Sequence, residues 1–382
     1  MKSMVVATGV KTQPASITIA WSDGTAGDFA SVWLRDNLPE DRDRHSGQRL
    51  IDVMDIPPAP RIRSASLTGA ALDVDWVDEP RRSSFDLRWL YECATGGSKR
   101  PELQTRLWLE GATLVPQRDF GWLAFPTLQS DPHARLAWLT RLLQDGVAFL
   151  SEVPRRNHAI LEATACIGYV PETNYGRVFD VRAVPQPENL AYSDLGLGLH
   201  TDNPYREPVP GFQALHTLVA APDGGDSLFA DGFAIAEHLR KTEPEAFGTM
   251  SRTPVPFWYR AAGVDLYAER PLIELSCTGA VTAVNYNNRA IRPVRLPAAE
   301  CSAYYASYRK FAGLLREPRL QMVTRLKDGD LAIFDNRRVL HGRTGFASPQ
   351  HPRHLQGCYL TRDSVYSETA VLRRQLDGGE MA

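Results

Sequence analysis

The chain has 382 residues, of which 43% are hydrophobic and 23% charged, a composition typical of a globular protein with a sizeable core. Its 43 Lys and Arg nearly balance 45 Asp and Glu, and the net charge of −2 argues against binding nucleic acid through bulk positive charge. No apolar run reaches the ~18 residues of a membrane span, and no secretory apolar segment follows Met1. The five cysteines are widely spaced and form no CxxC motif. We therefore expect a cytoplasmic protein with reduced thiols and with no membrane or nucleic-acid partner.

The first part of the chain has the pattern of short β-strands. Residues 16–21 and 71–76 alternate between polar and apolar side chains, which is typical of strands with one buried face. A Gly, Ser and Pro cluster at 94–101 indicates a loop or linker. The sequence therefore predicts a small β-rich domain over residues 1–95, a linker over 96–110 and a larger domain over 111–382.

The larger domain begins with helices and continues with strands. Asp131 and Pro132 start a helix whose apolar stripe ends near Gly146, and a buried strand at 147–150 and a second helix at 158–168 follow. Beyond about residue 190 we predict short strands at 212–218, 227–229, 280–286 and 330–334, with helical insertions near 233–241 and 301–315. This pattern favours an α+β, mainly β fold, in which a β-sandwich or jelly roll carries helices on one side.

One motif has the residue types of a metal site. His200-Thr201-Asp202 is the only His-x-Asp in the chain, and in a strand its two outer residues would share one face. An imidazole and a carboxylate supply two ligands of a 2-His-1-carboxylate triad, which leaves coordination positions open on Fe(II). Taken alone, the motif is also typical of an exposed strand histidine beside an aspartate.

A second segment supplies the remaining residues of such a site. Residues 330–336 predict a strand and a turn, and His341 follows at an expected strand end. Arg353 stands twelve residues later, in a strand that would lie antiparallel to that of His341 if a hairpin joins them. A guanidinium there can grip the distal carboxylate of 2-oxoglutarate, although an ordinary surface ion pair is the alternative for a single Arg.

Together with several further motifs, these residues make the sequence resemble the Fe(II)/2-oxoglutarate-dependent dioxygenases, in particular the γ-butyrobetaine hydroxylase-like branch of the taurine dioxygenase superfamily. The resemblance covers nearly the whole chain. The further motifs are Trp33-Leu34-Arg35-Asp36-Asn37, Ala191-Tyr192, Gly224-Gly225-Asp226-Ser227, Asp231-Gly232-Phe233, Phe334-Asp335-Asn336 and Arg353-His354-Leu355.

This resemblance implies a homodimeric enzyme with a double-stranded β-helix, or jelly-roll, core. It implies that His200, Asp202 and His341 bind Fe(II). Arg353 would bind the far carboxylate of 2-oxoglutarate, with Ser227 as a hydroxyl partner. Such an enzyme consumes O₂ and 2-oxoglutarate, releases succinate and CO₂, and hydroxylates a substrate C–H bond.

The resemblance also implies a small zwitterionic substrate with a trimethylammonium group held in an aromatic cage. The residues at the matching positions are Tyr175, Phe179, Tyr192 and Tyr359, with Phe179 where a Trp is expected. A quaternary ammonium has no N–H donor, so ring faces and shape must recognise it. Taken singly, each ring is more typical of core packing.

At the anionic end of the substrate, Asn189 and Asn287 stand at positions that resemble the carboxylate-binding amides of the family, and Asn288 and Arg289 follow directly. If Arg289 points inward, the head group can be a phosphonate, as in 2-(trimethylammonio)ethylphosphonate, as well as the carboxylate of γ-butyrobetaine. A solvated Arg289 is the alternative. The sequence does not choose between these substrates, and a trimethyllysine hydroxylase, a non-catalytic betaine-binding sensor and a structural β-sandwich module are further alternatives.

The chain departs from this family in its N-terminal domain. Relatives commonly hold a structural zinc there, but the matching positions read Leu38, Glu40, Asp43 and Pro80. Glu40 and Asp43, with nearby His45, form a hard-oxygen cluster that suits structural zinc poorly. We predict a charged surface loop and no structural zinc.

Overall fold

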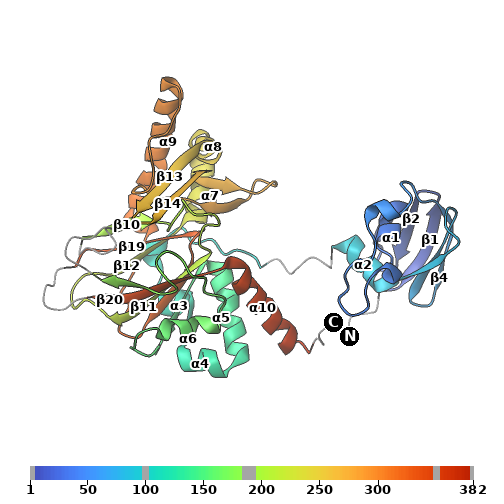
Figure 1. Ribbon diagram of the computed structural model, residues 1–382, viewed down its shortest axis with the longest axis horizontal. Helices are drawn as coiled ribbons and strands as arrows, with labels where there is room; N and C mark the ends of the chain where they lie inside the picture. Colours follow the sequence, from blue (N-terminus) through green and yellow to red (C-terminus); the bar gives the residue numbers. More distant parts are fainter. Residues whose placement is uncertain (1–4, 97–102, 183–194, 347–352, 379–382) are drawn as a thin grey trace. The chain divides into compact units, whose positions relative to one another are not determined.

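The computed structural model describes residues 5–96, 103–182, 195–346 and 353–378 (Figure 1). These residues form two compact units, one on either side of the gap at 97–102. Residues 103–110 of the predicted linker belong to the second unit. Within the described residues, no helix is both long and apolar enough to cross a membrane.

The first unit contains two three-stranded antiparallel sheets around one apolar core. Side chains on alternate positions of the strands face this core, so that Ile17 and Ile19 are buried from one sheet and Leu72 and Val74 from the other, as the period-2 pattern predicts. The sheets consist of β1 (Ala7–Gln13), β2 (Ser16–Trp21) and β3 (Ala26–Ala30), and of β4 (Ile62–Thr68), β5 (Ala71–Trp76) and β6 (Arg82–Asp86). The helices of this unit are α1 (Ser31–Asp36), α2 (Leu87–Thr95) and the short 3-10 turns η1 (Pro39–Asp41) and η2 (Val53–Asp55).

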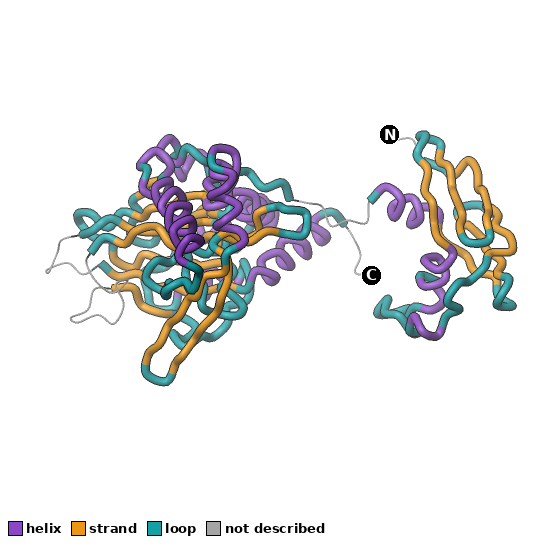
Figure 2. The backbone as a smooth tube through the Cα atoms, turned by 90° about the horizontal axis from the view of Figure 1, so that it is seen from above, coloured by secondary structure: helices purple, strands orange, loops and turns teal. Residues whose placement is uncertain are grey.

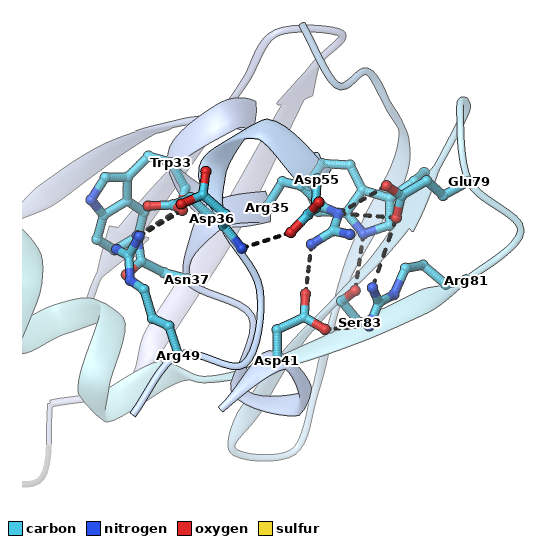
Figure 3. A network of polar contacts seen from close by, with 12 residues as sticks. Trp33, Arg35, Asp36, Asn37, Asp41, Arg49, Asp55, Glu79, Arg81 and Ser83 are labelled. Carbon is cyan, nitrogen blue, oxygen red and sulfur yellow. Dashed lines mark hydrogen bonds and ion pairs between the residues drawn. The ribbon is translucent and has the colours of Figure 1, made fainter. Parts of the chain in front are cut away.

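Where the resemblance would place zinc, this unit has a network of ion pairs (Figure 3). The buried guanidinium of Arg35 bonds Asp41 at 2.6 Å and Glu79 at 2.9 Å. Leu38 is fully buried among apolar side chains, and Glu40 is exposed. Ion pairs and apolar packing therefore connect the segment after α1 to the sheet that contains β6.

The second unit contains a jelly-roll core of two facing sheets (Figures 1 and 2). The larger sheet has the order β7-β8-β18-β11-β20-β9 and the smaller sheet the order β10-β19-β12-β17. All neighbours are antiparallel except β7 and β8. The strands are β7 (Gly121–Ala124), β8 (Val147–Ser151), β9 (Phe179–Arg182), β10 (Leu197–His200), β11 (Phe212–Val219), β12 (Ser227–Asp231), β17 (Met322–Thr324), β18 (Leu331–Asp335), β19 (Val339–Arg343) and β20 (His354–Leu360).

Helices pack against the core in two groups. One group shares an apolar cluster with the larger sheet and comprises α4 (Phe125–Ser130), α5 (Pro132–Asp145), α6 (Ala159–Ala165) and α10 (Arg362–Leu376). A second cluster joins α7 (Gly232–Thr242), α8 (Pro244–Arg252) and α9 (Ala298–Arg316) to β13 (Pro254–Ala261), β14 (Val264–Pro271), β15 (Ile273–Leu275) and β16 (Val281–Val284). The remaining short elements are α3 (Pro116–Asp119), η3 (Gly111–Thr113) and η5 (Pro318–Leu320).

The local signals for α5 are confirmed. The Asp131 carboxylate accepts hydrogen bonds from the backbone N–H groups of His133 and Ala134, and Gly146 ends the helix with a φ of 76°, which a residue without Cβ adopts readily. The predicted pairing of the His341 and Arg353 strands is wrong. β19 pairs with β10 and β12, whereas β20 pairs with β11 and β9, so the two segments belong to opposite sheets.

Candidate active site

Three ligand-type side chains meet where β10 ends beside β19. His200 and His341 are directly opposed in the antiparallel register of these strands, and their ring centroids are 4.3 Å apart. His200 Nε2 is 3.3 Å from Asp202 Oδ1. One donor atom from each of the three residues lies within 4.8 Å of the others. The structure therefore gathers the predicted His-Asp-His set, although His341 lies in the middle of β19 rather than at a strand end.

Asp202 reaches this position from a turn and not from strand alternation. β10 ends at His200, so the expectation that one strand presents both side chains on one face is wrong. Instead, the backbone N–H of Asp202 donates to Asn336 Oδ1 at 2.7 Å. Asn336 Nδ2 donates to the Asp202 carbonyl at 3.0 Å. Asn336 is fully buried in the turn between β18 and β19. Because β19 contains His341, the hydrogen bonds of Asn336 fix the backbone of Asp202 relative to the strand of His341.

The electrostatic environment of His341 and Asp202 suits a metal. Burial, with a smaller contribution from neighbouring His200, lowers the pKa of His341 to about 3, so its imidazole is neutral at pH 7. His200 Nδ1–H donates to the Gly198 carbonyl at 3.0 Å, and this bond orients the ring so that Nε2 lies 3.3 Å from Asp202 Oδ1. Burial works to raise the pKa of Asp202, but its hydrogen bond with His200 and attraction to both histidines hold this pKa below the usual range.

These observations test whether the residues fit a divalent metal. Ligand nitrogens and oxygens must be unprotonated to bind a metal, and the lowered pKa values of His341 and Asp202 leave both of these side chains unprotonated at neutral pH. His341 Nδ1 is buried and has no hydrogen-bond partner among the described residues. Two imidazoles and one carboxylate form the donor set of non-haem Fe(II) oxygenases, which leaves open positions on the metal. The residues therefore fit Fe(II).

A cavity of about 320 Å³ opens beside this cluster. It is lined by ten of the predicted site residues, which are Tyr175, Phe179, His200, Asp202, Ser227, Asn287, Arg289, His341, Arg353 and Tyr359. Asn288 is exposed and is not among the lining residues. Tyr192 and Asn189 lie outside the described residues.

Aromatic rings form one wall of the cavity. The ring centroids of Phe179 and Tyr359 are 5.2 Å apart, and those of Tyr175 and Phe179 are 6.1 Å apart. Tyr205 and Tyr259, which belong to none of the sequence motifs, stack with ring centroids 5.1 Å apart and also line the cavity. Tyr205 stands close to the His-x-Asp motif in sequence, but Tyr259 lies on the distant strand β13 and no local signal indicates it.

Two cationic side chains line the same cavity. Arg353 precedes β20 and is 7% exposed. Burial and neighbouring Arg343 lower the pKa of Arg353 to about 10, so it still carries a charge at pH 7. Arg289 is half-buried, and burial lowers its pKa against the attraction of Asp202. No carboxylate of the described residues lies within ion-pair distance of either guanidinium.

Asn287 is buried beside Arg289, but much of its amide is engaged within the protein. Its Nδ2 donates to the Thr201 carbonyl at 3.1 Å. Its Oδ1 is buried without a hydrogen-bond partner among the described side chains. An acceptor oxygen does not bind an anion, so Asn287 has at most one free N–H to offer there.

Comparison with known proteins places this site in a family. Residues 116–359 match the family described as "Taurine catabolism dioxygenase TauD, TfdA family", and this match covers more than half of the chain. The chain belongs to the TauD/TfdA dioxygenase family. Residues 9–91 match the N-terminal domain described as γ-butyrobetaine hydroxylase-like. The enzyme class, the jelly-roll fold and the dependence on Fe(II), 2-oxoglutarate and O₂ that the sequence predicts are thereby confirmed.

Similar proteins span almost the whole of this TauD/TfdA-family chain. The γ-butyrobetaine dioxygenase of Pseudomonas sp. (strain AK-1) is 34% identical over 368 residues, which cover 94% of each chain. That of Homo sapiens is 30% identical over 378 residues, covering 94% of this chain and 95% of the human one. The mitochondrial trimethyllysine dioxygenase of Bos taurus is 29% identical over 356 residues, covering 91% of this chain and 83% of the relative.

Proposed function

We propose that this dioxygenase hydroxylates a C–H bond of a small zwitterion that carries a trimethylammonium group. The observation that carries the proposal is the aromatic-walled cavity that opens directly beside the His200–Asp202–His341 cluster. A substrate held by this wall sits next to the proposed metal without needing to ligate it, as oxygenase chemistry requires.

The metal and the co-substrate have separate binding groups in this proposal. His200, Asp202 and His341 would hold Fe(II), which, together with 2-oxoglutarate, supplies the activation of O₂ and yields succinate and CO₂. The Arg353 guanidinium would bind the far carboxylate of 2-oxoglutarate bidentately, with the Ser227 hydroxyl as its partner. Both side chains are mostly buried and line the cavity, so the charge pair would be shielded from water and salt.

The cationic end of the substrate would lie against the aromatic wall. Tyr175, Phe179 and Tyr359 are the predicted cage residues, and Tyr205 and Tyr259 extend the same surface. Each ring face would contribute about 0.5–2 kcal/mol toward a desolvated quaternary ammonium. The role of Tyr192 in the cage remains a prediction.

The anionic end would lie toward Arg289. Its guanidinium lines the cavity and forms no ion pair with a described carboxylate, so it is available to a substrate anion. Asn287 and Asn189 would add amide N–H donors. The relatives named γ-butyrobetaine dioxygenase favour a carboxylate, and the positive charge of Arg289 suits a phosphonate such as 2-(trimethylammonio)ethylphosphonate equally. Trimethyllysine is the second candidate, because relatives named trimethyllysine dioxygenase are also similar.

A substrate panel tests the proposal. The purified protein is loaded anaerobically with Fe(II) and 2-oxoglutarate, and O₂ is added with γ-butyrobetaine, 2-(trimethylammonio)ethylphosphonate, trimethyllysine or taurine. Succinate formation and a 16 Da mass gain, the mass of one added oxygen atom, score turnover. We expect turnover of a trimethylammonium compound and none of taurine. Binding that raises the melting temperature without substrate-dependent succinate would instead support a betaine-binding sensor.

The oligomeric state and the compartment belong to the same proposal. We propose a homodimer, which light scattering coupled to size-exclusion chromatography would check. All five cysteines are unpaired, which supports a reducing, cytoplasmic compartment.

A further inference from the structure

The two carboxylate oxygens of Asp202 have different partners. Oδ1 is 3.3 Å from His200 Nε2 and therefore faces the histidine pair. Oδ2 instead accepts a hydrogen bond of 2.8 Å from the Tyr359 hydroxyl. We infer that Tyr359 is a positioning residue, whose O–H holds Oδ2 and presents only Oδ1 toward the metal. The inference rests on the proposed function, since it takes Asp202 to be a metal ligand.

The Tyr359 hydroxyl is itself held by a buried hydrogen-bond chain. Asn203 Nδ2 donates to the Tyr359 hydroxyl at 3.1 Å, and the Tyr205 hydroxyl donates to Asn203 Oδ1 at 2.7 Å. The hydroxyls of Tyr175 and Tyr205 are 3.3 Å apart. Asn203, Tyr205 and Tyr359 are each at most 6% exposed. The chain therefore runs without interruption from the aromatic wall of the cavity to the carboxylate.

The donor directions along this chain are consistent. Asn203 can only donate through Nδ2 and only accept through Oδ1, so the Tyr205 proton points to Asn203. The Tyr359 hydroxyl accepts from Asn203 and has one proton, which goes to Asp202. Asn203 has a φ of 54°, a left-handed conformation that Asn tolerates better than most residues.

Control of the second carboxylate oxygen has a chemical consequence. With two histidine ligands and a carboxylate that binds through one oxygen, an octahedral metal would keep three positions open. A carboxylate that binds through both oxygens would occupy one of these three positions. A hydrogen bond to the distal oxygen opposes the two-oxygen mode, and such outer partners orient metal ligands in general. Tyr359 therefore has two separable functions, in which its ring faces the cavity and its hydroxyl orients Asp202.

The substitution Tyr359→Phe separates these functions, because it keeps the ring and removes only the hydroxyl. We expect Mn(II) to bind about 10–100-fold more weakly than to the wild-type protein, measured by electron paramagnetic resonance without 2-oxoglutarate or substrate. The visible band of the anaerobic Fe(II)/2-oxoglutarate complex should also shift. Equal Mn(II) affinity and an unchanged band would overturn the inference.

Two controls separate orientation from other effects of the substitution. Tyr304 is buried on α9, does not line the cavity, and has a hydroxyl without a hydrogen-bond partner among the described residues. Tyr304→Phe therefore loses a buried hydroxyl with no expected effect on Mn(II) affinity. Tyr308→Phe removes a second tyrosine hydroxyl on α9 away from the cavity and should also leave this affinity unchanged. Weaker Mn(II) binding by either control to the same extent as Tyr359→Phe would contradict a specific role of the hydroxyl.

A further variant covers the case in which Tyr359→Phe does not fold. Asn203→Gly tolerates the left-handed backbone and frees the Tyr359 hydroxyl to rotate away from Asp202, so a smaller loss of Mn(II) affinity is expected. A wild-type affinity in this variant would count against the inference. Wild-type protein that binds Mn(II) but turns over no panel compound would refute the substrate proposal alone. Failure of the wild-type protein to bind Mn(II) would refute the metal assignment and, with it, the role of Tyr359.

Discussion

His200 and His341 face each other across antiparallel strands, with ring centroids 4.3 Å apart. The pairing of β10 with β19 thus places two imidazoles from distant parts of the chain on one site. Because both strands are hydrogen-bonded into the same sheet, the two rings need no conformational change to approach each other.

Loss of either imidazole should abolish metal binding. For His341→Ala, we expect no visible band when Fe(II) and 2-oxoglutarate are added anaerobically, because two remaining ligands bind the metal much more weakly. His238→Ala on α7 is the matched control, since His238 belongs to no group of three or more ligand-type residues among the described residues, and it should retain the band. A band of normal intensity in the His341 variant would show that this residue is not a ligand.

Recognition of the anionic head group of the substrate should depend on Arg289. Removing its guanidinium in Arg289→Ala deletes a charge-assisted contact of about 1.5–3 kcal/mol, so kcat/KM for the preferred zwitterion should fall about 10–100-fold. The loss should be larger for the phosphonate, which carries more charge, than for the carboxylate. Steady-state kinetics on both compounds checks this, with Arg309→Ala on the exposed face of α9 as the control. An unchanged ranking and rate would place the substrate anion elsewhere.

The stability of the second unit should fall in acid because of His216. This residue is fully buried on β11, and burial lowers its pKa to about 4 from a usual value of 6.5. Between these pH values the unfolded chain binds a proton at His216 and the folded chain does not. The stabilisation is therefore complete above about pH 6.5 and is lost as the pH falls toward 4.

Urea unfolding at several pH values measures this contribution. Between pH 7 and pH 4 the wild-type protein should lose about 2 kcal/mol more of its free energy of unfolding than His216→Phe. The exposed His133 supplies the control. His133→Ala leaves the buried His216 in place and should lose as much free energy of unfolding between pH 7 and pH 4 as the wild-type protein. If the free energy of unfolding falls equally with pH in the wild-type protein and in His216→Phe, the buried His216 is not the cause of the loss of stability in acid.

The N-terminal unit should depend on ion pairs and not on zinc. Arg35 has a side chain only 6% exposed and bonds two carboxylates, so Arg35→Met leaves Asp41 and Glu79 without their partner. We expect a loss of about 3 kcal/mol in the stability of this unit, seen as a lower midpoint of its thermal transition. Dialysis against EDTA should leave the wild-type midpoint of that transition unchanged. A lower midpoint after EDTA treatment would reveal a structural metal.

Several local features could be predicted from the sequence because they depend on neighbouring residues. Asp131 and Gly146 define α5 through a side-chain cap and a left-handed end, and the alternation in residues 71–76 matches β5. His200, Asp202, His341 and Arg353 were identified as candidates because their spacing matches a family. A hairpin that would pair the His341 and Arg353 strands does not form, and the sequence between them does not indicate that the chain crosses from one sheet to the other.

The sequence by itself determined the helix caps and the alternating strands, since these follow from residue type and short-range spacing, and its match to a family pattern indicated the donor residues of the site. Only the tertiary structure decided that Asn336 holds the backbone of Asp202, that Tyr259 joins the aromatic wall and that the Tyr359 hydroxyl bonds Oδ2. These contacts join residues from different strands and turns. Their formation depends on how the two sheets pack, which no local pattern of residues encodes.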